Sequence, residues 1–151
     1  MKRTKILTTT IGSFPKPKYL PIIDWFDSAR GEDGMNTVKT TIEYSLYNKN
    51  KKKSDEELFK RAASEIIKIQ LDAGIDIPTD GEIRRENYIH YHCRHLDGFD
   101  FDKLEHRVLR DGAYSTSLPA IRSKIKHTGK YYSPNDYIAS QSLSRKPVKF
   151  T

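Results

Sequence analysis

The acidic turn Thr79-Asp80-Gly81-Glu82 holds the side chains of this sequence whose types and spacing best suit chemistry. It follows directly on Ile75 to Pro78, a short apolar stretch that we predict to be a strand. In parallel α/β sheets the carboxyl ends of the strands open onto the ligand site, and a glycine between two carboxylates lets the backbone bend. We therefore predict that Glu82 points into a ligand site with Asp80 in support. The alternative is a surface turn in which Glu82 caps the next helix.

Two arginines, Arg84 and Arg85, come directly after this turn. They either bind a carboxylate or phosphate of a ligand, or hold Asp80 and Glu82 in position by ion pairing. Because adjacent charges of opposite sign usually pair, we favour the positioning role.

A second candidate ligand site lies at the end of the first apolar segment, Lys5 to Ile11. Its β-branched residues predict a strand that is buried on both faces. The turn that follows contains Gly12, which allows a ligand to approach the backbone, and Ser13, which adds a hydroxyl. The alternative is an ordinary turn before Pro15.

The cluster His90, His92, Cys93 and His95 has the residue types of a zinc site. On a helix, however, His90 and His92 point to nearly opposite sides, and only His92 and His95 share a face. A tetrahedral zinc site needs four convergent ligands. We therefore interpret the cluster as part of a partly buried helix rather than as a metal site.

Motifs and composition exclude several classes of function. The sequence has no Walker-type loop, no G-x-S-x-G and no G-x-G-x-x-G, so serine catalysis and dinucleotide binding have no support. The single cysteine excludes an intrachain disulfide and fits a reducing compartment. No run of about 18 apolar residues is present. We expect a soluble, cytoplasmic protein without a membrane partner.

The charge is concentrated in the last third of the chain. Residues 101–151 carry ten Lys or Arg against four acids, which accounts for +6 of the net charge of +7. This excess predicts a solvated face or, alternatively, a site for a phosphate or polycarboxylate. No known nucleic-acid motif accompanies it, so we expect no nucleic-acid partner.

The elements that must position these turns alternate between helices and strands. The most secure helix runs from Ser54 to Ala73, with a capping box of Ser54 and Glu57 and a stop at Gly74. Weaker helical patterns cover residues 22–29, 37–47, 83–96 and 133–143. We expect residues 103–132 to be an irregular insertion. Residues 147–151 are typical of the opening of a third buried strand.

This order of elements predicts an α/β fold that is only part of a larger one. Two strands and the start of a third, joined by helical crossovers, do not enclose a core. The pattern is that of the first part of a (β/α)₈ TIM barrel, which needs about 250 residues.

Three stretches together resemble the catalytic domain of cobalamin-independent methionine synthase, in matching order and spacing. They are Thr9 to Pro15, Gly74 to Glu82 and Leu96-Asp97-Gly98-Phe99. Pro147 to Thr151 also resembles the strand before the Pro-Gly-Pro turn of that family. The resemblance implies that residues 1–151 are the N-terminal portion of an incomplete (β/α)₈ barrel.

The resemblance also implies a function. The family transfers a methyl group, from methyltetrahydrofolate or another carrier, to the zinc-bound thiol of homocysteine and so forms methionine. This is the activity of a 5-methyltetrahydropteroyltriglutamate–homocysteine S-methyltransferase. By resemblance Ile11, Gly12 and Ser13 contact the amino-acid substrate and Glu82 accepts its ammonium group, with Asp80 and Arg85 in support.

The same resemblance leaves parts of the machinery outside the sequence. The zinc ligands of the family (His, Cys, Glu, Cys) are expected beyond Thr151, so we predict no metal ligand and no catalytic residue in this chain, and no activity for the chain alone. An Arg-Cys pair that contacts the folate donor in the family falls near Tyr114-Ser115, where the arginine is missing. Two alternatives are a basic binding module for an anionic partner and a decayed product without activity.

Overall fold

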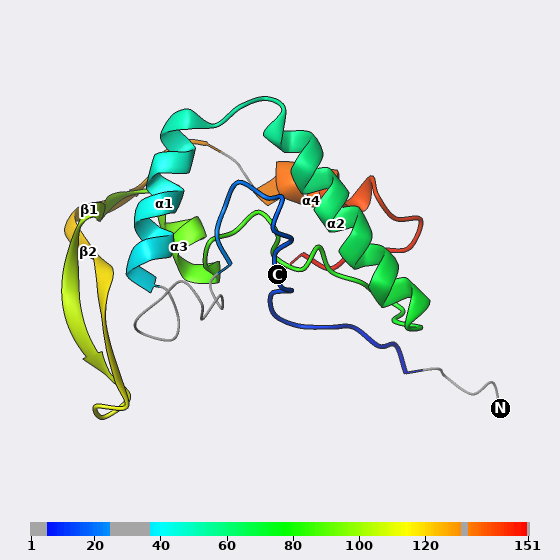
Figure 1. The fold of residues 1–151 in the computed structure, drawn as a ribbon, viewed down its shortest axis with the longest axis horizontal. Helices are drawn as coiled ribbons and strands as arrows, with labels where there is room; N and C mark the ends of the chain where they lie inside the picture. The colour runs from blue at the N-terminus through cyan, green and yellow to red at the C-terminus, as the bar shows by residue number, and fades with distance from the viewer. Residues whose placement is uncertain (1–5, 25–36, 131–132, 151) are drawn as a thin grey trace. The chain divides into compact units, whose positions relative to one another are not determined.

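The computed structural model describes residues 6–24, 37–130 and 133–150, and in these ranges it is an α/β structure, as predicted. Its elements are α1 (Thr37–Asn50), α2 (Asp55–Asp72), α3 (Tyr88–Cys93), β1 (Leu96–Leu109), β2 (Tyr114–His127) and α4 (Ser133–Gln141), shown in Figure 1. Among the described helices, none has the length and apolar character needed to cross a bilayer.

The chain divides into two compact units, which we describe separately. The first unit contains Met1–Pro17, Ser54–Arg84 and Tyr131–Thr151, and the second contains Lys18–Lys53 and Arg85–Lys130. The candidate turns at residues 12–14 and 80–82 both belong to the first unit, whereas Arg85 and the histidine cluster belong to the second.

Helix α2 is the main helix of the first unit. Its buried residues recur at helical spacing and include Phe59, Ala63 and Ile67. Gly74, at φ 85°, ends the helix region as predicted. The predicted capping box is wrong: Ser54 has helical dihedrals and its side chain makes no cap hydrogen bond. A side-chain cap requires an extended N-cap residue, and this geometry is missing here.

The three predicted parallel strands of the first unit are reduced to isolated bridges. Thr9 pairs with Ile77, and Thr79 pairs with Lys149, both in parallel orientation. The Ile77 N–H donates to the Thr8 carbonyl at 3.0 Å, and the Lys149 N–H donates to the Pro78 carbonyl at 2.8 Å. The segment around residues 77–79 therefore lies between the other two.

The predicted burial of the first segment on both faces is wrong. Ile6, Leu7 and Ile11 are 88%, 61% and 88% exposed. Within the described residues the backbone of this segment pairs only with the segment around Ile77. Side chains of a strand point out of the plane of the sheet, so they stay in solvent wherever no packed layer covers that face.

The side chain of Gln70, on α2, joins the helix to two of these segments. Its amide nitrogen donates to the Thr79 carbonyl at 2.8 Å, and its amide oxygen accepts the Thr79 N–H at 2.9 Å. The same oxygen accepts the hydroxyl of Thr10 at 2.6 Å. The buried Gln70 amide thus satisfies both backbone polar groups of Thr79, in addition to the bridge that this residue forms with Lys149.

The second unit combines α1, α3 and the β1–β2 hairpin (Figure 1). The predicted helix over residues 83–96 is too long, because α3 begins after Asn87 and the chain is already in β1 at Leu96. The Asn87 side chain accepts the N–H groups of Ile89 at 2.8 Å and His90 at 3.0 Å. This cap fixes the start of the helix.

Residues 103–132 are not the irregular segment that we predicted, since most of them lie in an antiparallel hairpin. Its pairing shifts between Asp97 and Phe99 and again between Asp100 and Glu105. Such bulges interrupt the alternation by which a strand is recognised in a sequence. Tyr131 and Tyr132 lie outside the described residues.

The other helix predictions have mixed outcomes. Helices α1 and α4 confirm the patterns over residues 37–47 and 133–143. The pattern over 22–29, with Trp25 and Phe26, falls mainly outside the described residues.

Candidate functional site

The two candidate turns of the first unit lie against each other. The Phe14 N–H donates to the Gly81 carbonyl at 2.9 Å. Gly81 has a φ of 67°, and a Cβ placed on it would lie 3.0 Å from Phe14 Cβ and from Ile66 Cγ2. Only glycine fits here without displacing a neighbour. The turns at residues 12–14 and 80–82 therefore lie side by side.

Glu82 combines burial with an unusual backbone conformation. It is 8% exposed, and its φ of 57° lies in the left-handed region. For a residue other than glycine this conformation costs about 1 kcal/mol. Among the residues that the structure describes, the Glu82 carboxylate has neither an ion pair nor a hydrogen bond. A buried carboxylate of this kind is suited to accept a cationic group of a ligand.

Asp80 is a buried residue that stabilises the turn through hydrogen bonds of its carboxylate. It is 3% exposed, and its Oδ1 accepts the backbone N–H of Glu82 at 3.0 Å. Its Oδ2 lies 3.3 Å from the hydroxyl of Ser140, a buried residue of α4. Nothing in the sequence marks Ser140 as a contact of Asp80, because a serine within a helix is ordinary.

The other predicted residues of the first turn differ in their exposure. Ile11 is exposed, Gly12 has a φ of 85° and Ser13 is half-buried. Lys149, one of the basic residues of the last third, donates from its ammonium group to the Thr10 carbonyl at 2.5 Å. A cation therefore lies close to the end of the first segment.

The two arginines lie in different surroundings. Arg84 forms a bidentate ion pair with Glu56 of α2, at 2.7 and 2.8 Å, and lies over the ring of Phe59. Its main acidic partner is thus not an acid of the neighbouring turn. Arg85, in the second unit, is buried, and its guanidinium lies 5.9 Å from the ring centroid of Tyr91.

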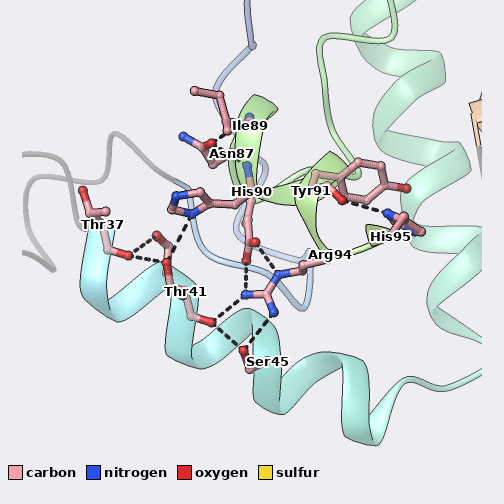
Figure 2. Close-up of polar contacts among 11 residues, drawn as sticks. Thr37, Thr41, Ser45, Asn87, Ile89, His90, Tyr91, Arg94 and His95 are labelled. Carbon is pink, nitrogen blue, oxygen red and sulfur yellow. Dashed lines mark hydrogen bonds and ion pairs between the residues drawn. The ribbon is translucent and has the colours of Figure 1, made fainter. Parts of the chain in front are cut away.

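A buried polar network holds the second unit together (Figure 2). The guanidinium of Arg94 donates to both carboxylate oxygens of Glu86, at 2.5 and 3.0 Å. It also donates to the Ser45 hydroxyl and the Thr41 carbonyl of α1, each at 3.0 Å. The ring of Phe101 lies 4.0 Å away. These contacts connect α1, β1 and the segment around α3, so we assign the network to structure.

The histidine cluster belongs to this packing. Nδ1 of His90 lies 3.4 Å from the Thr41 hydroxyl, and Nδ1 of His95 lies 2.8 Å from the Tyr91 carbonyl (Figure 2). Burial, with a contribution from the charge of Arg94, lowers the pKa of His90 to about 4. Burial also raises the pKa of the Cys93 thiol, which disfavours the thiolate that a metal binds.

These residues do not fit a zinc ion. Across the described ranges, no three His, Cys, Asp or Glu side chains are grouped in a way that would hold a metal.

Comparison with known proteins places these observations in a family. Residues 6–150 match the family model described as cobalamin-independent synthase, catalytic domain. The methionine synthase of Sulfolobus acidocaldarius is 33% identical over 125 residues, which are 82% of this chain and 30% of that protein. The methionine synthase of Saccharolobus islandicus is 34% identical over 94 residues, which are 62% of this chain and 23% of that protein.

A solved structure is similar as well. It is a B12-independent methionine synthase from Shewanella sp. W3-18-1 in complex with selenomethionine, 26% identical, with a TM-score of 0.62 over 93% of this chain and 36% of that one. The matched part of the chain thus corresponds to only 23% to 36% of the length of these relatives. Since the family model covers almost all of its residues, the chain belongs to the family of the cobalamin-independent synthase catalytic domain.

Proposed function

We propose that this chain is the N-terminal portion of a (β/α)₈ barrel that transfers a methyl group to the thiol of homocysteine, and that it supplies part of the amino-acid pocket. Family membership and the two relatives that are methionine synthases support this activity. The parallel order of the segments around Thr9, Ile77 and Lys149 is compatible with the first three strands of such a barrel.

The observation that carries the proposal is the buried carboxylate of Glu82. It lies at the end of the second parallel segment and next to the turn that ends the first. Within the described part of the chain it has no cation of its own. The α-ammonium group of homocysteine or methionine would supply that charge and up to three hydrogen-bond donors. The selenomethionine held by the Shewanella relative is an amino acid of this class.

The other residues take supporting roles in this proposal. In this proposal the substrate is contacted by Ile11, Gly12 and Ser13, at the end of the first segment. Gly12 has no side chain, so the substrate can approach its backbone closely. Asp80 holds the backbone of Glu82. Arg85 adds positive charge next to the acidic turn in the sequence.

Zinc would be bound by residues outside this chain. Its described residues do not fit the metal, so we assign to the chain neither a zinc ligand nor a step at the metal. Methyltetrahydrofolate and another methyl carrier both remain compatible as the donor, because the family arginine is missing at Tyr114-Ser115.

Calorimetry on the longest form of the protein that its gene encodes tests the proposal. Two ligands are compared: L-methionine, and 4-(methylthio)butanoate, which lacks the amine. We expect Glu82→Gln to weaken methionine binding about 10- to 100-fold, the effect of losing a hydrogen bond to a charged group. The amine-free ligand should bind equally to both proteins.

Glu57→Gln is the matched control, because Glu57 is an exposed acid of α2 whose one ion pair, within the described residues, is with Lys60 on the same helix. It should leave both affinities unchanged. Equal methionine affinity of the wild type and Glu82→Gln would contradict the proposal.

A further inference from the structure

We propose that Ser140 is a positioning residue for Glu82: its hydroxyl holds the carboxylate of Asp80, which in turn fixes the backbone from which Glu82 meets the substrate ammonium. This inference rests on the proposed function of Glu82. Ser140 lies 60 residues from Asp80 in the sequence and touches neither the substrate nor the reacting thiol in this scheme.

The contact is formed between two buried groups. Ser140 is 2% exposed, and its Oγ lies 3.3 Å from Asp80 Oδ2 and 2.9 Å from the Asp136 carbonyl. Its single hydroxyl proton is therefore shared between two acceptors. The other carboxylate oxygen of Asp80 accepts the Glu82 N–H. The Asp80 carboxylate thus spans the distance from α4 to the strained residue.

The turn needs such an anchor because two consecutive residues, Gly81 and Glu82, have left-handed backbones, with φ of 67° and 57°. An unrestrained chain would leave this conformation at Glu82. Gly81 is held on its other side by the hydroxyl of Thr79, which accepts the Gly81 N–H at 3.2 Å. Asp80 restrains Glu82 in the same way, because its carboxylate accepts the Glu82 N–H.

Helix α4 is itself fixed to the parallel segments, so Ser140 presents its hydroxyl from a defined place. The next residue, Gln141, accepts the Val148 N–H at 3.0 Å and donates to the carbonyls of Ser144 and Lys146, both at 3.0 Å. Lys149 then pairs with Thr79, directly before Asp80. Helix α4 is therefore connected to the acidic turn by the Gln141–Val148 hydrogen bond and by the bridge between Lys149 and Thr79.

Loss of the Ser140 hydroxyl should lower the fraction of molecules whose Glu82 is in the binding conformation. The apparent affinity for a ligand falls in proportion to that fraction, and only for a ligand that uses Glu82. A merely structural loss would weaken binding of every ligand. L-methionine and 4-(methylthio)butanoate separate these two cases.

The test uses Ser140→Ala, Asp80→Asn, the double variant and Glu82→Gln, each titrated with both ligands. We expect Ser140→Ala to weaken methionine binding about three- to tenfold and to leave the amine-free ligand unchanged. In the Asp80→Asn background the same change should alter methionine affinity by less than about twofold, because Ser140 acts through Asp80. Ser142→Ala is the control, since this exposed hydroxyl donates to the Ala139 carbonyl of its own helix region and, in the described part of the chain, to no other group.

The outcomes are distinct. If Glu82→Gln weakens methionine binding and Ser140→Ala does not, this inference is wrong and the proposed function stands. Equal weakening for both ligands, or an undiminished effect of Ser140→Ala without Asp80, also overturns it. If Glu82→Gln has no effect, the proposed function itself fails. Should Ser140→Ala not fold, Ser140→Thr, which keeps the hydroxyl, must retain the wild-type preference for methionine over the amine-free ligand.

Discussion

Glu82 and His90 illustrate how burial changes the chemistry of single residues. Both are 8% exposed. Glu82 has no partner for its charge among the described residues, whereas His90 lies beside a hydroxyl and an aromatic ring, those of Thr41 and Phe101. An uncompensated buried charge is suited to a ligand, and a neutral packed ring is suited to stability.

The buried His90 predicts how stability depends on pH. Its pKa is about 4 in the folded protein and returns to the ordinary value of 6.5 on unfolding. Between these values the unfolded chain binds more protons, so the free energy of unfolding decreases as the pH falls from 6.5 to 4. A shift of this size corresponds to about 3 kcal/mol.

Urea denaturation at several pH values between 7 and 4 measures this effect. We expect His90→Gln to lose stability less steeply than the wild type over this range. Carboxylates titrate in both proteins, so the difference between the two curves isolates His90. His106→Gln, at an exposed position of β1, is the control, and curves of equal slope for wild type and His90→Gln would contradict the prediction.

Among the elements, the β1–β2 hairpin has a bulged region that is held by side-chain contacts. Arg122, on β2, pairs with Glu105 and lies 4.0 Å from Asp100, on the two sides of the second pairing shift. Two backbone N–H groups, those of Asp102 and Lys103, bond to Asp100, and they lower the pKa of its carboxyl. The bulged strand is thus held in its bent form by local side-chain contacts.

Gly98 is required at the first bulge. Its φ is 99°, and a Cβ would lie 2.8 Å from the Ser123 carbonyl oxygen and 3.0 Å from that of Lys124. Because both neighbours are backbone atoms of the paired strand, they cannot move without breaking the pairing. We expect Gly98→Ala to lower the free energy of unfolding by about 2 kcal/mol or more in urea denaturation.

Gly112→Ala provides a matched comparison for Gly98→Ala. Gly112 also has a positive φ, of 91°, but no atom of the described residues lies within 4 Å of a Cβ placed on it. Gly112→Ala should therefore lower the free energy of unfolding only by the cost of the left-handed backbone, about 1 kcal/mol. Equal losses for the two variants would rule out a steric role for Gly98.

At the scale of the whole molecule, the two units differ in how their strands are completed. The hairpin of the second unit pairs over most of its length. The segments of the first unit pair through single bridges and leave Ile6 and Ile11 exposed. In a complete barrel further strands would cover such edges.

Hydrogen exchange should reveal this difference. We expect the amides of Ile77 and Lys149 to exchange faster than those of the middle of α2 and of the paired residues of the hairpin, because isolated bridges open without breaking a continuous ladder. Mass spectrometry after pulse labelling measures the exchange of each segment. Equal protection of the bridges and α2 would show that the first unit needs no further strands to be stable.

The sequence alone predicted those features that depend on neighbouring residues. The apolar stripe of α2, its end at Gly74, helix α4 and the acidic turn all follow from local spacing and residue type. The hairpin was not predicted, because its bulges break the alternation of apolar and polar residues by which a strand is recognised in a sequence.

Which distant side chains meet became known from the folded structure alone. Ser140 reaches Asp80 across 60 residues and Lys149 reaches Thr10 across 139, and the sequence around them does not distinguish these residues from exposed ones. Glu82 was recognisable as a candidate from its turn, but its burial and left-handed backbone were not. Local patterns record the preferences of adjacent residues, whereas contacts of this range exist only after the chain has packed.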